Sequence, residues 1–286
     1  MKLSAFLELL KFQWAAILNK SERQKKADRD CTAHPSQNRD GCSCDLLEAF
    51  LKRLHDLCNY YSACNGKERS DRIRAQTQQV VALATEFGIL KTPGITWDKF
   101  KHGVSKKKIG TEHVVEFDEK SKLVGKTTIP SGFGLIPQLR KFPQVSLRDE
   151  TLSFEEKIEF FSATPLEYLT RWMANNEVFN DDVRLVSVIE WADKTISFGI
   201  TQPQYHGDPA EQRDIESYFL NAGWERLHDP SGHQIYFNYA HEIRAIDAVS
   251  RNCFLNESGL QPFDVILHKP GKELERFLKI YPDSEV

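Results

Sequence analysis

Hydrophobic residues recur at helical spacing in three stretches near the N-terminus. Each stretch presents one apolar face, and the three cover residues 3–19, 45–65 and 68–87. The last two are each followed by a glycine, which is typical of a helix end. Residues 20–44 are polar and predict a flexible linker. The pattern therefore predicts a helical N-terminal region over residues 1–95.

After this region, short apolar runs typical of strands alternate with helical patterns. The expected strands cover residues 114–117, 123–128, 183–188, 195–201 and 234–237. The expected helices cover residues 153–161, a segment from Thr164 or Pro165 through Val178, and residues 210–222. This order predicts an α+β fold over residues 96–286, with a linker at 202–209.

Composition is that of a globular protein with a core. Of 286 residues, 40% are apolar and 28% charged, and the net charge of −3 does not favour general nucleic-acid binding. No apolar run reaches the length of a membrane span. Glu8, Lys11 and Gln13 interrupt the N-terminal apolar stretch, which argues against a signal peptide. We expect a cytoplasmic protein that does not associate with membranes.

The cysteines offer two interpretations. Cys31, His34, Cys42 and Cys44 are residue types that bind zinc. Their spacing lacks the paired Cys-x2-Cys pattern of zinc sites, and Cys58 falls on the apolar face of an expected helix. We therefore expect reduced cysteines without a metal, and the role of Cys31, Cys42 and Cys44 stays open.

The strongest chemical signal lies near the C-terminus. Asp247 is followed by Asn252 and then by Asp264, and a hairpin signal separates the last two. The expected hairpin has strands at 253–255 and 262–267, so it brings Asn252 and Asp264 to one end. Oxygen-bearing side chains that converge in this way suit Mg²⁺ together with phosphate oxygens. Polar residues are also ordinary in loops, but an acid within an apolar strand is costly unless it binds something.

Four segments together resemble a known family: GTEHVVEFDEKSKLVGKTT, ATPLEYL, AIDAVSRN and PFDVIL. Residues from about 105 to 270 resemble the kinase-like domain of polyvalent proteins from phages and mobile elements, and are more distantly similar to protein kinases and aminoglycoside phosphotransferases. The resemblance implies a minimal two-lobed protein-kinase-like fold, with a small lobe at 96–201 and a reduced large lobe at 202–286. It also implies ATP and Mg²⁺ as cofactors.

The resemblance implies a role for each matching residue. Lys126 contacts the α- and β-phosphates of ATP, and Glu167 pairs with Lys126. Asp247 orients the acceptor hydroxyl and takes its proton. Asn252 and Asp264 hold the metal ions. Taken singly, Lys126 also fits an edge-strand lysine, and Glu167 fits an ordinary acid in the first turn of a helix.

Nucleotide contacts are expected at two further places. Gly110 is what remains of the glycine-rich loop, and Glu112 and His113 stand where backbone amides normally cover phosphates. Gln202 and Gln204 belong to the expected hinge, which offers backbone groups to adenine.

The sequence also departs from the protein-kinase pattern. Val249 stands where protein kinases have a catalytic-loop lysine, and Val265-Ile266 follows Asp264 in place of Phe-Gly. Only about twenty residues follow, so we expect no activation segment or peptide-docking subdomain.

Two functions are therefore expected from different classes. The first is an ATP- and Mg²⁺-dependent phosphotransferase whose acceptor is a small molecule, a nucleic acid or a protein. The alternative is a pseudokinase-type module that binds nucleotide or acts through a protein partner on its N-terminal helices. The basic run 20–26 leaves a nucleic-acid partner open, although the overall charge does not favour one.

Overall fold

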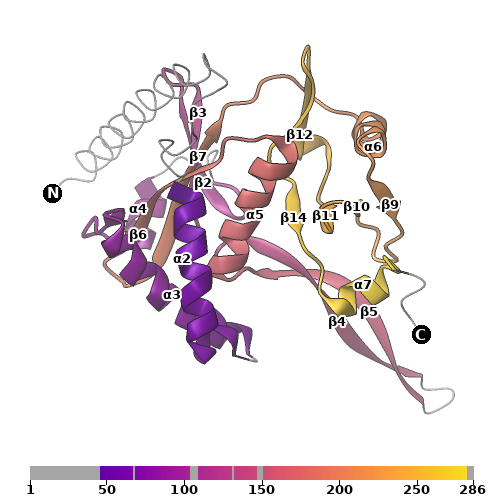
Figure 1. The fold of residues 1–286 in the computed structure, drawn as a ribbon, viewed down its shortest axis with the longest axis horizontal. Coiled ribbons are helices and arrows are strands. Elements are labelled where there is room, and N and C mark those ends of the chain that lie inside the picture. The colour runs from indigo at the N-terminus through magenta and orange to yellow at the C-terminus, as the bar shows by residue number, and fades with distance from the viewer. Residues whose placement is uncertain (1–45, 67, 104–108, 131, 147–150, 282–286) are drawn as a thin grey trace, which may run out of the picture. The chain divides into compact units, whose positions relative to one another are not determined.

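The computed structural model describes residues 46–66, 68–103, 109–130, 132–146 and 151–281. The expected helix at 3–19, the linker at 20–44 and the cysteines at 31, 42 and 44 lie outside these ranges. The described chain is a mixed α+β structure with several sheets, as the sequence predicts (Figure 1). Within it, no helix is long and apolar enough to cross a membrane.

The chain forms two units, and each is built from two separate stretches of sequence. Unit 1 contains the described residues up to Phe133 together with Arg184–Gln202. Unit 2 contains Gly134–Val183 and the described residues from Pro203 onward. The chain therefore passes from unit 1 to unit 2 at Gln202, within the expected hinge. The helices expected at 45–65 and 68–87 belong to the same unit as the first β-hairpin.

Unit 1 is organised around a five-stranded sheet in the order β1-β6-β7-β3-β2. Its strands are β1 (Leu90–Lys91), β2 (His113–Asp118), β3 (Leu123–Thr128), β6 (Arg184–Glu190) and β7 (Ile196–Pro203). The expected hairpin is confirmed, because β2 pairs antiparallel with β3 across a turn at 119–122. Strand β7 lies in the middle of the sheet, and all of its residues are buried except the last. Its continuous burial reflects this position, and the buried residues include the polar Ser197, Thr201 and Gln202.

Helices α2 (Leu46–Tyr60) and α3 (Arg69–Glu86) both pack on β6. The buried residues of α2 are spaced three and four apart, and the short helix η1 (Ser62–Asn65) follows it. Gly88 has φ +68°, and the N–H of Ile89 donates to the carbonyl of Ala84 at 2.9 Å. This Schellman ending confirms the expected glycine stop of α3. The apolar faces of α2 and α3 are thus buried within unit 1.

The short helix α4 (Trp97–Gly103) packs against the rest of unit 1 through an aromatic cluster. Trp97 and Phe100 lie 5.4 Å and 4.8 Å from the ring of Trp191, which follows β6. Aromatic contacts at these separations add to the hydrophobic gain of burial.

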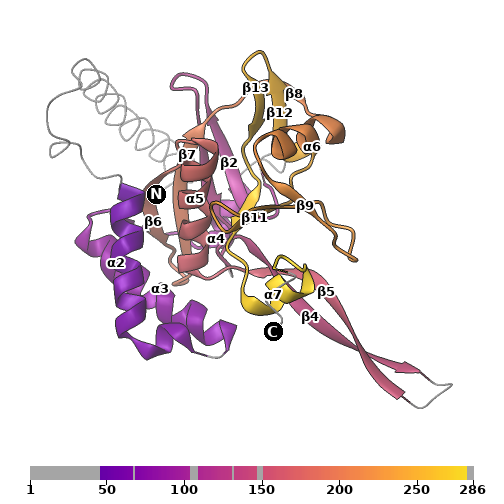
Figure 2. The ribbon, with the colours of Figure 1, turned by 45° about the vertical axis from the view of Figure 1, so that its right-hand side comes forward.

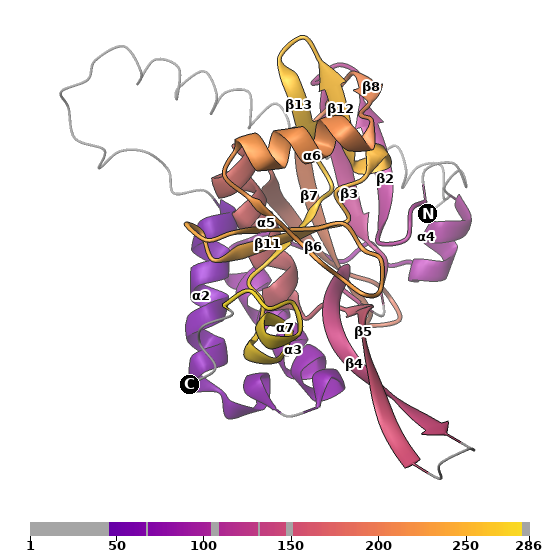
Figure 3. The same ribbon diagram turned by 90° about the vertical axis from the view of Figure 1, so that its right-hand side faces the viewer.

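The described residues of unit 2 form two more sheets, a two-stranded hairpin, three α-helices and one short 3-10 helix. One sheet has the order β14-β11-β10-β9, and a smaller one has the order β13-β12-β8. The strands are β8 (Asp208–Pro209), β9 (Glu225–Leu227), β10 (Ile235–Asn238), β11 (Ile243–Ile246), β12 (Cys253–Asn256), β13 (Gly259–Pro262) and β14 (Ile266–His268). The helices are α5 (Pro165–Phe179), α6 (Gln212–Asn221) and α7 (Lys272–Phe277), and Figure 3 shows α6 from the side.

The larger sheet of unit 2 buries both faces, because its residues alternate between two cores. On one face, Phe219 of α6 stacks on Tyr236 at 4.4 Å, in a cluster that also contains Ala245. On the other face, Phe237 and Ile246 pack with residues of α7. The expected helix at 210–222 and the strand at 234–237 are confirmed.

The helix expected at 153–161 is wrong. This segment is part of β5 (Thr151–Ser162), which pairs along its whole length with β4 (Leu135–Ser146) in a long hairpin (Figure 2). Leu152, Phe154, Ile158 and Phe160 have the same parity, so they lie on one face of the strand. Glu156 interrupts this alternation, and the Glu-rich composition favours a helix when pairing partners are unknown. Tertiary pairing overrides that local preference.

The hairpin after Asn252 is confirmed, but the expected returning strand at 262–267 is displaced. Strand β13 ends at Pro262, and the next strand, β14, pairs with β11 rather than with β12. Asp264 therefore does not lie within a strand. It occupies the irregular segment that joins the two sheets of unit 2.

Candidate functional site

Two strand pairings bring the predicted catalytic residues to one place in unit 2. Ile246 pairs with Ile266, so Asp247 and Asp264 lie just beyond the same end of the β11–β14 pair. Cys253 pairs with Pro262, and the Phe263 N–H donates to the Asn252 carbonyl at 3.1 Å. The hairpin thus places Asn252 beside the segment that contains Asp264, as the sequence predicts.

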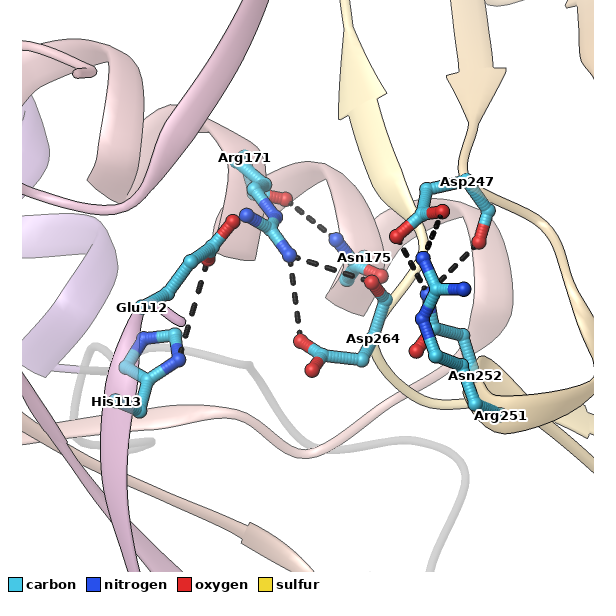
Figure 4. Close-up of polar contacts among 8 residues, drawn as sticks. All are labelled: Glu112, His113, Arg171, Asn175, Asp247, Arg251, Asn252 and Asp264. Carbon is cyan, nitrogen blue, oxygen red and sulfur yellow. Dashed lines mark hydrogen bonds and ion pairs between the residues drawn. The ribbon is translucent and has the colours of Figure 1, made fainter. Parts of the chain in front are cut away.

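Asp247 is held by its own loop. The Asn252 side-chain amide donates to the Asp247 carbonyl and to Oδ2, both at 2.8 Å. The backbone of Asp247 has φ +63°, a left-handed conformation that costs less for Asp than for most residues. A sharp turn directly after β11 therefore fixes the carboxylate (Figure 4).

The guanidinium of Arg251 forms an ion pair with the other carboxylate oxygen of Asp247. Its guanidinium lies 2.6 Å from Oδ1 of Asp247, and the Arg251 side chain is 70% exposed whereas that of Asp247 is 28% exposed. An exposed ion pair of this kind adds little stability. It does place a cation next to the predicted base, two positions after Val249.

Asp264 is held by a distant element. Nη2 of Arg171, on α5, lies 3.3 Å from both the carbonyl oxygen and Oδ1 of Asp264. The Arg171 side chain is 5% exposed and that of Asp264 is 33% exposed. Figure 4 shows this contact beside the Asp247 loop. The two aspartates of the predicted site therefore differ in the element that fixes them.

The donor set of Asn252 and Asp264 fits Mg²⁺ that is shared with a phosphate. Mg²⁺ uses one or two carboxylates and completes its shell with water and substrate oxygens. The Asn252 amide nitrogen is engaged by Asp247, which leaves its amide oxygen as the group to meet a cation. Among the described residues, no group of three His, Cys, Asp or Glu forms a metal cage. The residues fit a metal bound together with its substrate better than a metal held by protein alone.

Lys126 lies on β3 in unit 1 and is 5% exposed. Strand β3 has neighbours on both sides in the sheet, and Lys126 is opposite Val115 of β2. This position excludes the alternative of an exposed lysine on an edge strand. A buried lysine needs a specific reason, because burying its charge is costly.

The segment before β2 is a tight turn. The Gly110 N–H donates to the carbonyl of His113 at 2.8 Å, so this amide bonds to its own turn. Nδ1 of His113 lies 3.9 Å from Oε2 of Glu112. The imidazole thus lies near the carboxylate of Glu112, as Figure 4 shows. A role for Gly110 in covering phosphates stays a prediction.

Glu167 forms part of the cap of α5. The Thr164 N–H donates to the Glu167 carboxylate at 2.8 Å, and the Glu167 N–H donates to the Thr164 hydroxyl at 3.2 Å. This capping box explains why the helix starts at Pro165, and it gives Glu167 a structural role. Glu167 belongs to unit 2 and Lys126 to unit 1, so their pairing stays a prediction.

The expected hinge contains the point at which the chain leaves unit 1 and enters unit 2. Gln202 is buried at the end of β7, and Gln204 follows in unit 2. The Tyr205 hydroxyl donates to Oδ1 of Asp181 at 2.6 Å. Burial, together with this carboxylate, raises the pKa of Tyr205 above its ordinary value. Tyr205 therefore fixes the first residues after the passage to the body of unit 2. Adenine binding by Gln202 and Gln204 stays a prediction.

The described cysteines are buried thiols. Cys58 and Cys64 of unit 1 are free, and burial is the largest cause that raises the pKa of Cys58. In unit 2, burial and then the charge of Asp247 raise the pKa of Cys253 to about 12. Thiols with raised pKa values are poor metal ligands and poor nucleophiles. The expectation of reduced structural cysteines fits Cys58 and Cys253 on this ground, and Cys64 is a free, buried cysteine.

The sequence indicates Asp247, Asn252 and Asp264 but misses the two arginines that hold the aspartates. A signal for Arg251 exists, since it follows Asp247 by four residues. Arg171 follows Glu167 by four residues on α5, but its contact with Asp264 spans 93 positions. Comparison of the chain with protein-family models, curated proteins and solved structures finds no match.

Proposed function

We propose that the protein is an ATP- and Mg²⁺-dependent phosphotransferase with a minimal kinase-like fold. The supporting observation is the convergence of Asp247, Asn252 and the Asp264 segment at one end of two strand pairs. This convergence agrees with the resemblance to the kinase-like domain of polyvalent proteins. In this proposal, Lys126 contacts the phosphates of ATP, and the loop that begins at Asp247 is the catalytic loop.

The chemistry follows from the residue types. Asp247 is an acceptor-only carboxylate, held by an amide on one oxygen and an arginine on the other. It would receive the hydroxyl proton of the acceptor while the hydroxyl oxygen attacks the γ-phosphorus of ATP. ADP leaves with the electron pair of the broken phosphoanhydride bond. Bound Mg²⁺ supplies electrostatic stabilisation of the phosphates, and Asn252 and Asp264 would hold it.

The proposed acceptor is a small molecule, a nucleic acid or a protein, including the protein itself.

The alternative proposal is a pseudokinase-type module that binds nucleotide without transferring phosphate. It is favoured by the Gly110 amide, which bonds to its own turn, and by Arg251, which occupies the Asp247 carboxylate. The apolar faces of α2 and α3 are already buried in unit 1, so a protein partner of the N-terminal region would have to use other residues.

Thermal unfolding with ATP, Mg²⁺, both or neither tests nucleotide binding. A ligand at about 100 times its dissociation constant stabilises the folded state by about 2.7 kcal/mol. We expect a shift of the wild-type protein that needs both ligands, and a smaller ligand-dependent shift for Asp264→Asn. Each variant is compared with its own ligand-free state, because Asp264 also contributes to folding through Arg171. The absence of any shift for the wild type would contradict both proposals.

Transfer of labelled γ-phosphate, or release of ADP, separates the two proposals. Asp247→Asn should keep the ligand-dependent thermal shift and lose turnover, since it removes the base but preserves the size of the side chain. Turnover of the wild type above that of a double Asp247→Asn/Asp264→Asn variant excludes the pseudokinase. Equal turnover of these two proteins excludes the phosphotransferase.

A further inference from the structure

Helix α5 reaches into the candidate site through one buried side chain, Arg171. The same Nη2 atom lies 3.3 Å from two oxygens of Asp264, one on the backbone and one on the carboxylate. The guanidinium lies over the ring of Trp172 at 4.9 Å. A cation this deeply buried is stable only beside an acceptor or an opposite charge. Asp264 provides both.

Arg171 stands on a rigid part of the helix. The capping box fixes the start of α5, and the Asn175 side chain donates to the Arg171 carbonyl at 2.8 Å. The end of α5 is fixed by Asn176, whose side chain forms two hydrogen bonds of 2.8 Å with the backbone of Val183. The backbone on both sides of Arg171 is therefore held by side chains, and Figure 4 shows the one from Asn175.

Asp264 has a different setting. It lies between β13 and β14, in a segment without strand pairing of its own. The carboxylate therefore depends on side-chain contacts for its direction. The guanidinium of Arg171, which contacts both its backbone and its side chain, is suited to fix that direction.

We propose that Arg171 is a positioning residue that orients the Asp264 carboxylate as a ligand of Mg²⁺. The inference rests on the proposed phosphotransferase function. A carboxylate has lone pairs on two oxygens, so it accepts from a guanidinium and binds a cation at the same time. Side chains that orient metal ligands typically change metal affinity by about 10- to 100-fold when they are replaced.

A competing interpretation predicts the opposite sign. If Arg171 only neutralised Asp264, its positive charge would oppose a second cation, and removal of Arg171 would tighten Mg²⁺ binding. The direction of the change in Mg²⁺ affinity therefore separates orientation from simple neutralisation.

The first experiment needs neither metal nor nucleotide. Unfolding free energies of the wild type, Arg171→Met, Asp264→Asn and the double variant form a double-mutant cycle. We expect the double variant to lose less stability than the sum of the single variants, because each single variant leaves one member of the pair behind. Additive losses would show that the two residues do not interact, and would overturn the proposal.

The second experiment measures Mg²⁺ affinity. The Mg²⁺ midpoint of the nucleotide-dependent thermal shift is determined at a fixed ATP concentration for the wild type, Arg171→Lys and Arg171→Met. We expect the midpoint to rise about 10- to 100-fold for Arg171→Met. The Mg²⁺ midpoint of Arg171→Lys should lie between those of the wild type and Arg171→Met, because an ammonium keeps the charge but lacks the planar guanidinium. An unchanged or lower midpoint overturns the proposal.

Controls keep the outcomes distinct. Arg226→Met removes an arginine paired with Glu216 at 2.7 Å elsewhere in unit 2, and should leave the Mg²⁺ midpoint unchanged. If Arg171→Met does not fold, Arg171→Lys decides the result. If the wild type shows no Mg²⁺-dependent shift, the proposed function and this inference both fail. A coupling in the metal-free cycle would then assign the Arg171–Asp264 pair to stability alone.

Discussion

The two aspartates of the candidate site are held in contrasting ways. Asp247 is fixed by residues four and five positions further along its own loop, Arg251 and Asn252. Asp264 is fixed by Arg171, which is 93 positions away on a buried helix. One aspartate therefore depends on local sequence, whereas the other depends on the packing of unit 2.

Because of this difference, replacement of the two aspartates should affect function and stability to different extents. The Asp247–Arg251 pair includes an exposed cation, so water screens it and its loss should cost little. The Asp264–Arg171 pair includes a buried cation, and loss of the carboxylate removes an opposite charge beside that cation. Replacement of Asp247 should thus affect mainly function, and replacement of Asp264 should affect both function and folding.

The largest expected difference is in the cost of removing each charge. Asp264→Asn should lower the free energy of unfolding by about 1–3 kcal/mol, because it leaves Arg171 buried beside a neutral group. Asp247→Asn should lower it by less than about 1 kcal/mol. Denaturant unfolding of both variants measures the difference. Equal losses would remove the contrast between the two sites.

The backbone of Asp247 provides the next test. Asp247→Ala and Asp247→Gly both remove the carboxylate, but only Gly adopts φ +63° without a steric cost. We expect the Gly variant to be more stable than the Ala variant by about 1 kcal/mol. The two midpoints of urea unfolding measure this difference. A more stable Ala variant would mean that the turn relaxes when the side chain is removed.

The cap of α5 should matter for Asp264 more than for Asp247. Thr164→Ala removes the hydroxyl that accepts the Glu167 N–H, and should cost about 1 kcal/mol. Hydrogen exchange should quicken in the first turn of α5 but not in the Asp247 loop. Thr164→Ser is the matched control, since serine keeps the capping hydroxyl.

The smallest expected effect is that of Arg251→Ala. An exposed ion pair contributes about 0–1 kcal/mol, and salt should reduce even this contribution. Unfolding at low and high ionic strength tests the expectation. A loss as large as that of Asp264→Asn would show that Arg251 is a structural residue of the loop.

The contrast between local and distant contacts also explains which features can be predicted from the sequence. The expected Asp247–Asn252 loop agrees with the structure because its contacts join near neighbours in the chain. The β2–β3 hairpin and the start of α5 are also local, since a turn and a capping box specify them. The contact of Arg171 with Asp264 has no local signal.

Errors in the expected elements have the same origin. The segment 153–161 has helix-forming residues, but twelve residues of β4 pair with β5 and determine its conformation. The strand expected at 262–267 is divided, because β14 finds its partner in β11. In each case the deciding partner is a different stretch of the chain, whose position cannot be read from the segment alone.

The division of each unit into two stretches of sequence has a consequence for synthesis on the ribosome. Strands β6 and β7 lie inside the unit 1 sheet, so that sheet remains incomplete until residue 202 has emerged. By then β4, β5 and α5 of unit 2 have already emerged from the ribosome. Their apolar residues cannot yet be buried, because the rest of the unit 2 core has not been made. Neither unit can complete its folding before most of the chain has been synthesised. A fragment that ends at Phe133 should therefore aggregate rather than fold, and the nascent chain should require protection by chaperones.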